Sequence, residues 1–155
     1  MTDLGLIDSA LLVAIANGVN SLKSLCHVLS GFSEDVVRRH LESLESKGLV
    51  KRRVKGLIFK REVYELTEEG SRMLEEAYSK LREAAEKLKR VAERADHERE
   101  GPEALKRALR EAGLGLDVLP LVQLMALLGL LDVFLLPLFL DFFDPSMLGG
   151  YEHWV

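Results

Sequence analysis

The residues best suited to chemistry in this sequence are a cluster of cations. Between positions 47 and 61 the chain has seven basic residues and no acidic one: Lys47, Lys51, Arg52, Arg53, Lys55, Lys60 and Arg61. Each cation that neutralises a nucleic-acid phosphate releases condensed counterions, and this release drives salt-dependent binding. The whole chain has a formal net charge of -4. Affinity for a nucleic acid is therefore expected from this local patch rather than from overall charge.

Other reactive groupings are absent from the sequence. The single cysteine, Cys26, cannot form a disulfide within the chain, and the four histidines share no metal-ligand spacing. There is also no Ser, His and Asp grouping and no glycine-rich phosphate loop. We therefore expect no enzymatic activity, no metal and no cofactor. Cys26 itself is expected to be a small core residue of the second helix rather than a redox sensor.

Three short helices should precede the cations. Apolar residues at helical spacing predict a first helix over 4–17. Ser21 can cap a second helix that ends near Gly31, and Ser33 can cap a third whose buried stripe comprises Val36, Val37, Leu41 and Leu44. The third helix should end at Lys47 and Gly48.

The cations themselves lie in a predicted β-hairpin. Two strand-like runs, 49–54 and 57–66, flank Lys55 and Gly56, which form a tight-turn pair. The order helix, helix, helix, hairpin, long helix is the plan of a winged helix-turn-helix, in which the third helix enters the major groove and the hairpin follows the backbone.

On that plan the exposed face of the third helix should contact bases. Arg38 and Arg39 could reach guanine edges, and Ser33 and His40 could donate to phosphate or base. Glu34 and Asp35, at the start of this helix, suit the helix dipole and could accept from cytosine N4, although they face phosphate unfavourably.

Two stretches resemble known regulators. The sequence FSEDVVRRHLESLESKGLVKR, 32–52, is similar to the recognition helix of the PadR and MarR families, and VYELTEEGSRMLEE, 63–76, is similar to the segment that closes their wing. The resemblance covers about half of the chain, 6–76. It implies an α+β, mostly α-helical chain with a winged helix DNA-binding domain at residues 1–76. It also implies that a small-molecule effector, unidentified here, could bind beside the dimerisation helices.

A long helix should follow the wing. Thr67 can cap a helix that runs from Glu68 to about Glu100, so that 67–100 forms a dimerisation helix. An apolar repeat of seven predicts a coiled-coil seam and a homodimer, which would present two recognition helices to two DNA half-sites. The seam residues are Leu74, Ala77, Leu81, Ala84, Leu88 and Val91.

The C-terminal part has a different composition. Residues 101–113 predict a short amphipathic helix, 114–143 an apolar helical region, and 144–155 a tail. Residues 118–140 are apolar on all sides, which suits either a dimer core or a membrane segment. Prolines early in two similar stretches, after Asp117 and Asp132, predict short helices and favour the dimer core.

These observations predict a cytoplasmic, homodimeric, sequence-specific regulator that binds double-stranded DNA. Two alternatives remain. A winged helix can also be a protein-protein interaction module, because a fold does not determine a function. The other alternative is a regulator that is tethered to the membrane through residues 118–140.

Overall fold

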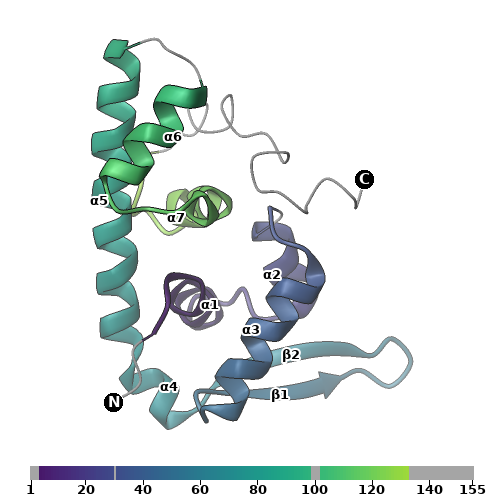
Figure 1. Cartoon of the computed structure of the whole chain (residues 1–155). Helices are drawn as coiled ribbons and strands as arrows, with labels where there is room; N and C mark the ends of the chain where they lie inside the picture. The colour runs from purple at the N-terminus through teal and green to yellow at the C-terminus, as the bar shows by residue number, and fades with distance from the viewer. Residues whose placement is uncertain (1–3, 30, 99–101, 133–155) are drawn as a thin grey trace. The chain divides into compact units, whose positions relative to one another are not determined.

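The structure is a computed structural model that describes residues 4–29, 31–98 and 102–132. The chain divides into two compact units, Met1–Leu81 and Arg82–Val155, and each is described separately below. In chain order the elements are α1 (Leu6–Ala16), α2 (Leu22–Val28), α3 (Glu34–Ser46), β1 (Val50–Lys55), β2 (Arg61–Leu66), α4 (Glu68–Arg72), α5 (Leu74–Glu98), α6 (Pro102–Glu111), the 3-10 helix η1 (Leu116–Leu121) and α7 (Val122–Leu127) (Figure 1).

The first unit is built around α1. All residues from Asp8 to Ile15 are buried, which is the pattern of a helix covered on all sides. It contacts both α3 and β2. Gly18 follows the helix with a φ of +92°, a left-handed conformation in which glycine carries no Cβ penalty.

The caps of α2 and α3 agree with the sequence prediction. The Ser21 hydroxyl accepts from the backbone N–H of Ser24, whose own side chain completes a capping box. The Ser33 hydroxyl accepts from the Val36 N–H at 3.3 Å. In α3 the buried residues are Val37, Leu41 and Leu44, so the predicted apolar stripe is confirmed except at Val36, which is half-buried.

The predicted hairpin is present, but its predicted turn is wrong. β1 and β2 pair antiparallel, and the last pair joins Lys55 to Arg61, so the connection is the loop 56–60 rather than a tight turn at Lys55 and Gly56. The prediction extended the second strand to Leu57 because Leu57, Ile58 and Phe59 are apolar. These side chains meet no second layer, and pairing therefore starts at Arg61. Figure 1 shows the hairpin reaching away from the helices of its unit, with the loop at its far end.

Thr67 joins the end of α3 to the end of the β-hairpin of residues 50–66, which we call the wing. Its hydroxyl donates to the Gly48 carbonyl at 2.6 Å and accepts from the Gly70 N–H at 3.0 Å. Its backbone N–H donates to the Leu49 carbonyl. Gly70 lies so close to this segment that a Cβ on it would be 2.0 Å from the Leu49 carbonyl oxygen. A glycine is therefore required where α4 crosses the start of β1.

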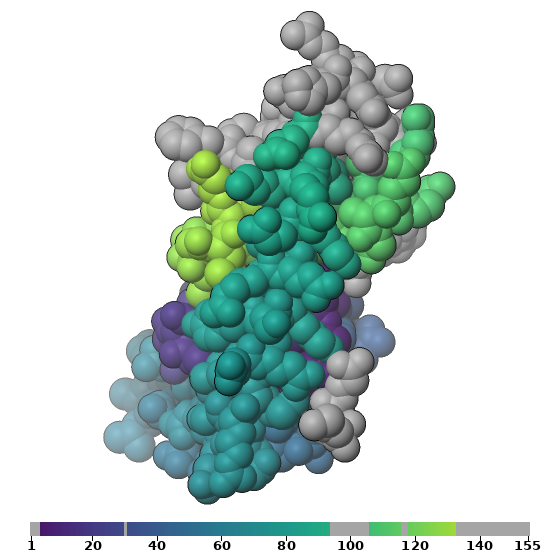
Figure 2. Space-filling model, turned by 90° about the vertical axis from the view of Figure 1, so that its left-hand side faces the viewer, coloured from purple at the N-terminus to yellow at the C-terminus, as the bar shows by residue number. Residues whose placement is uncertain are grey.

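The single long helix predicted from Glu68 is divided at Met73 into α4 and α5. Along α5 the predicted seam is buried within the single chain, with Ala77, Leu81, Ala84, Leu88 and Val91 at most 4% exposed. Leu74 is half-buried. Figure 2 shows the solvent-facing side of α5 in teal. Because most of the apolar stripe is already covered, little of it is left for a partner helix, and the coiled coil stays a prediction.

The second unit contains the short elements after α5. The amphipathic helix predicted over 101–113 is α6, with Gly113 just beyond it at a φ of +79°. In the apolar region η1 contains Pro120, as the short-helix interpretation expects, and its N-cap is Gly115. No helix among the described residues is both long and apolar enough to cross a bilayer. The remainder of the apolar region and the tail, 133–155, lie outside the described residues.

Candidate nucleic-acid interface

The helix α3 exposes the face opposite its buried stripe. Of the four residues predicted to read bases, Arg39 is exposed, and within the described ranges no carboxylate forms an ion pair with it. It stands beside a hollow of about 430 Å³ between α1 and α3. Arg39 is the one predicted base-reading side chain whose charged group is not committed to another element of its unit, as far as the structure describes them.

The other three predicted readers are engaged locally. Ser33 caps α3. The Nδ1 atom of His40 is 2.9 Å from a carboxylate oxygen of the buried Asp8 on α1, and the Lys47 ammonium is 3.7 Å from the other oxygen of that carboxylate. Arg38 donates to both carboxylate oxygens of Glu62 at 3.1 Å and to Glu34 at 3.2 Å. The structure therefore directs these groups toward the protein rather than toward a ligand.

The exposed surface of α3 is more acidic than the predicted site suggested. Besides Glu34 and Asp35, the helix exposes Glu42 and Glu45. This second pair was not predicted from the sequence, although the spacing of seven between Asp35 and Glu42 places them on one helical face. Since carboxylates repel phosphates, α3 cannot supply the electrostatic attraction to a nucleic acid alone.

Within the described part of the chain, the wing holds a group of exposed cations that form no ion pair. Two of the seven predicted backbone contacts are paired across the hairpin: Arg53 is 3.2 Å from Glu65, and Arg52 is 3.8 Å from Glu62. Lys47 faces Asp8. The remaining four are exposed and form no ion pair within the part of the chain that the structure describes. We call them the wing cations: Lys51, Lys55, Lys60 and Arg61.

Glu62 connects the wing to α3. Its carboxylate accepts from Arg38, lies near Arg52 and accepts from the Tyr64 hydroxyl at 3.3 Å. Desolvation alone would raise the pKa of Glu62, but the Arg38 hydrogen bond and the charges of Arg38 and Arg52 together lower it. Burial, followed by the charge of Glu62, raises the pKa of Tyr64 to about 12. Glu62 is thus a negatively charged group that holds α3 in a defined position against β2.

Replacing Glu62 with glutamine should lower the thermal unfolding midpoint at pH 7 by a few degrees, because Arg38 keeps Glu34 but loses the carboxylate that joins it to β2. Folding lowers the pKa of Glu62. The Arg38–Glu62 pair therefore stabilises the fold fully above the unfolded carboxyl pKa, about 4.3. This stabilisation is lost as the pH falls through the lower pKa of the folded state. Thermal denaturation at several pH values measures this. Glu65→Gln, which removes a more exposed pair, is the matched control. Equal midpoints for Glu62→Gln and wild type at pH 7 would contradict the prediction.

Cys26, expected to be a small core residue of the second helix, is half-buried on α2. Burial, and then the charge of Glu34, raises the pKa of this thiol, while Arg38 opposes the change. A raised pKa reduces the thiolate fraction at neutral pH and with it the nucleophilicity of the sulfur.

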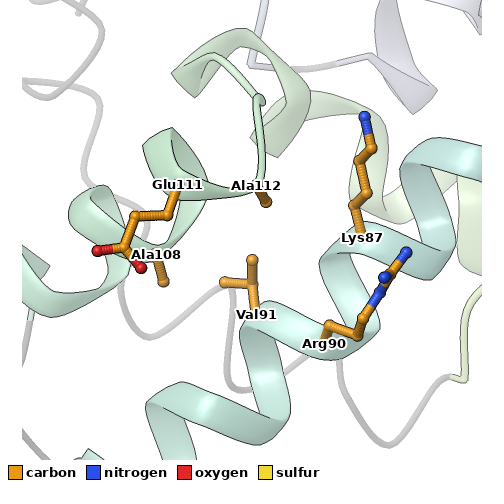
Figure 3. A pocket seen from close by; sticks show the side chains of 6 residues that line it. All are labelled: Lys87, Arg90, Val91, Ala108, Glu111 and Ala112. Atoms are coloured by element: carbon orange, nitrogen blue, oxygen red, sulfur yellow. The ribbon is translucent and has the colours of Figure 1, made fainter.

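The second unit contains a separate hollow between α5 and α6, with a volume of about 390 Å³. Figure 3 shows Val91 pointing toward Ala108 and Ala112, with Lys87 and Arg90 on one side and Glu111 on the other. Its size falls in the range of small-molecule pockets, about 300 to 1,000 Å³. The lining combines an apolar floor with charges of both signs, a mixture that selects no single class of ligand.

Comparison with protein families gives a match to the family described as HxlR-like helix-turn-helix, over residues 8–94. The chain belongs to the HxlR-like helix-turn-helix family. The match begins within α1, contains α2, α3 and the wing, and extends into α5. The HxlR-like family is one of DNA-binding transcriptional regulators rather than enzymes. Membership supports the winged helix-turn-helix prediction, but the family is HxlR-like, and the specific resemblance to PadR and MarR is not supported. No curated protein and no solved structure matched the chain.

Proposed function

We propose that this HxlR-like chain is a sequence-specific regulator that binds double-stranded DNA, with α3 in the major groove and the wing on the backbone. The observation that carries the proposal is the placement of uncommitted charge in the first unit. The wing cations and Arg39 are exposed and without carboxylate partners among the described residues, although the chain as a whole is acidic.

The two groups have different tasks in this proposal. The wing cations neutralise phosphates and supply the salt-dependent part of affinity. Arg39 donates in bidentate fashion to a guanine edge, which distinguishes one base pair from another. The carboxylates of Asp35 and Glu42, on the same face, reject phosphate and can accept from cytosine N4. Arg38, held by Glu62, positions α3 against the wing instead of contacting DNA.

Fluorescence anisotropy of the full chain tests the proposal, with a duplex from its own upstream region and a random duplex of equal length, each at two salt concentrations. We expect affinity that falls as salt rises and that favours the upstream duplex. Arg39→Ala should reduce the preference about tenfold, the value of one good bidentate contact. Arg90→Ala, which removes an exposed arginine of α5, is the control. Equal affinity of wild type for both duplexes would contradict sequence-specific reading.

Homodimerisation belongs to the proposal because a twofold pair would place two copies of α3 on two half-sites. Since the predicted seam of α5 is largely covered within one chain, the pair would need another surface. Leu127 on α7 is an exposed apolar side chain, 64% accessible, that could contribute to one. Light scattering of the full chain measures the mass, and a monomer at micromolar concentration would contradict this part.

A second candidate function is a protein-binding winged helix. The exposed carboxylates of α3, Glu34, Asp35, Glu42 and Glu45, favour it because they suit a basic protein surface better than a phosphate backbone. This alternative predicts no salt-linked affinity for either duplex in the anisotropy experiment.

A further inference from the structure

The loop of the wing ends in three large apolar side chains that face solvent. Leu57, Ile58 and Phe59, the wing tip, are 98%, 85% and 89% exposed. They are more exposed than any other large apolar side chain in the described part of the chain. Large apolar groups are seldom left this accessible in a cluster unless they bind something. The wing tip is therefore a candidate contact surface.

The wing tip has a defined backbone shape. Gly56, just before it, has a φ of +104°, and a Cβ there would lie 2.2 Å from the Phe59 carbonyl oxygen. The loop thus folds back closely on Gly56 and holds the three side chains at the end of the hairpin. The adjoining strand offers them no apolar layer, because every residue of β1 after Val50 is exposed. The local geometry presents the wing tip outward.

Cations adjoin the wing tip on both sides. Lys55 precedes it at the end of β1, and Lys60 and Arg61 follow it; all three are wing cations without carboxylate partners among the described residues. An apolar projection bordered by cations is complementary to a DNA groove, where two phosphate rims enclose stacked bases. Proteins that bend DNA insert apolar side chains of this kind between base steps of the minor groove.

We propose that the wing tip is a minor-groove wedge that partly unstacks a base step and bends the duplex. This inference rests on the proposed DNA-binding function and adds a specific task for the loop. Phe59 offers the largest flat surface for stacking on an exposed base, while Leu57 and Ile58 fill the groove beside it. The flanking cations hold the two phosphate rims. Sequence preference then arises from how easily a step deforms, since these side chains have no donors or acceptors with which to read base edges.

Two triple variants of the full chain test the wedge. One removes the apolar surface (Leu57→Ser, Ile58→Ser, Phe59→Ser), and the other conserves it together with the aromatic ring (Leu57→Met, Ile58→Leu, Phe59→Trp). Energy transfer between dyes at the ends of the upstream duplex measures bending, and 2-aminopurine placed along it reports unstacking. Wild type and the conserving variant should bend the duplex and raise the 2-aminopurine fluorescence. The serine variant should lose both signals and bind about tenfold more weakly, with an unchanged salt slope.

Three other results would overturn the wedge, and they are distinguishable. If the serine variant bends and binds DNA like wild type, the wedge is wrong while the DNA-binding function stands. If wild type shows no salt-linked DNA binding, both fail. If the serine variant keeps full DNA affinity but loses adsorption to phosphatidylcholine and phosphatidylserine vesicles that wild type shows, the wing tip serves a lipid surface. Circular dichroism of both variants should match wild type, because the replaced side chains face solvent.

Discussion

Replacement of all four wing cations with alanine is expected to weaken binding to double-stranded DNA about 100-fold at low salt, since each of these side chains neutralises a phosphate in the proposed complex. The plot of the logarithm of affinity against the logarithm of salt concentration should become shallower by about 0.9 for each phosphate that is no longer neutralised. Affinity for the upstream and the random duplex should fall together, because the phosphate backbone is the same for every sequence. Anisotropy titrations at several salt concentrations measure both quantities.

The control for this variant is a second one with the same change in net charge. Arg72, Lys87, Lys89 and Arg90 lie on α4 and α5, and their replacement with alanine should change affinity and salt slope little. If both quadruple variants weaken binding equally, net charge rather than the wing is responsible. Such a result would contradict the assignment of the backbone contacts to the hairpin.

Replacement of Gly70 with alanine is expected to destabilise the first unit by about 2 to 3 kcal/mol. Two effects oppose each other. Alanine is favoured over glycine inside a helix by about 1 kcal/mol. The new Cβ, however, would stand 2.0 Å from the Leu49 carbonyl oxygen, and this neighbour is backbone that cannot rotate away. To relieve this clash, α4 must move away from β1. That movement would break the Thr67 hydrogen bonds to Gly48 and Leu49. The steric effect should therefore dominate.

Urea denaturation followed by circular dichroism measures the Gly70→Ala effect. Gly5→Ala is a suitable comparison, because nothing lies within 4 Å of a Cβ at that position and its φ is -70°. Gly5 is the N-cap of α1, and alanine there should cost less than about 1 kcal/mol. A Gly70→Ala chain as stable as wild type would show that α4 does not need this close approach.

The local elements of the first unit follow from short-range rules. The Ser21 and Ser33 caps and most of the buried positions of α3 depend on residues within about four positions, and the sequence was enough to predict them. The predicted turn of the wing was wrong for a different reason. Leu57, Ile58 and Phe59 have strand-like composition, but a strand also needs a partner and a layer to cover it.

In the candidate site, too, local features were predictable and long-range partners were not. Composition and order were enough to predict a basic hairpin after a third helix, and Arg39 remains available there. Arg38 and His40 are not available, because they pair with Glu62 and Asp8. The sequence did not predict these pairs, since the partners are 24 and 32 residues away along the chain. The run of seven cations ends at Arg61, one residue before the carboxylate that neutralises part of the cluster. Which charges remain uncommitted is a property of packing.

The sequence by itself determined the capped starts of α2, α3 and α4, most of the apolar face of α3 and the presence of a basic β-hairpin, since these depend on neighbours along the chain. Only the tertiary structure decided which cations stay exposed, that the wing ends in an apolar loop, and that most of the heptad stripe of α5 is covered within one chain. These outcomes depend on side chains brought together from distant segments. Such contacts arise when the elements assemble, and no local pattern records them.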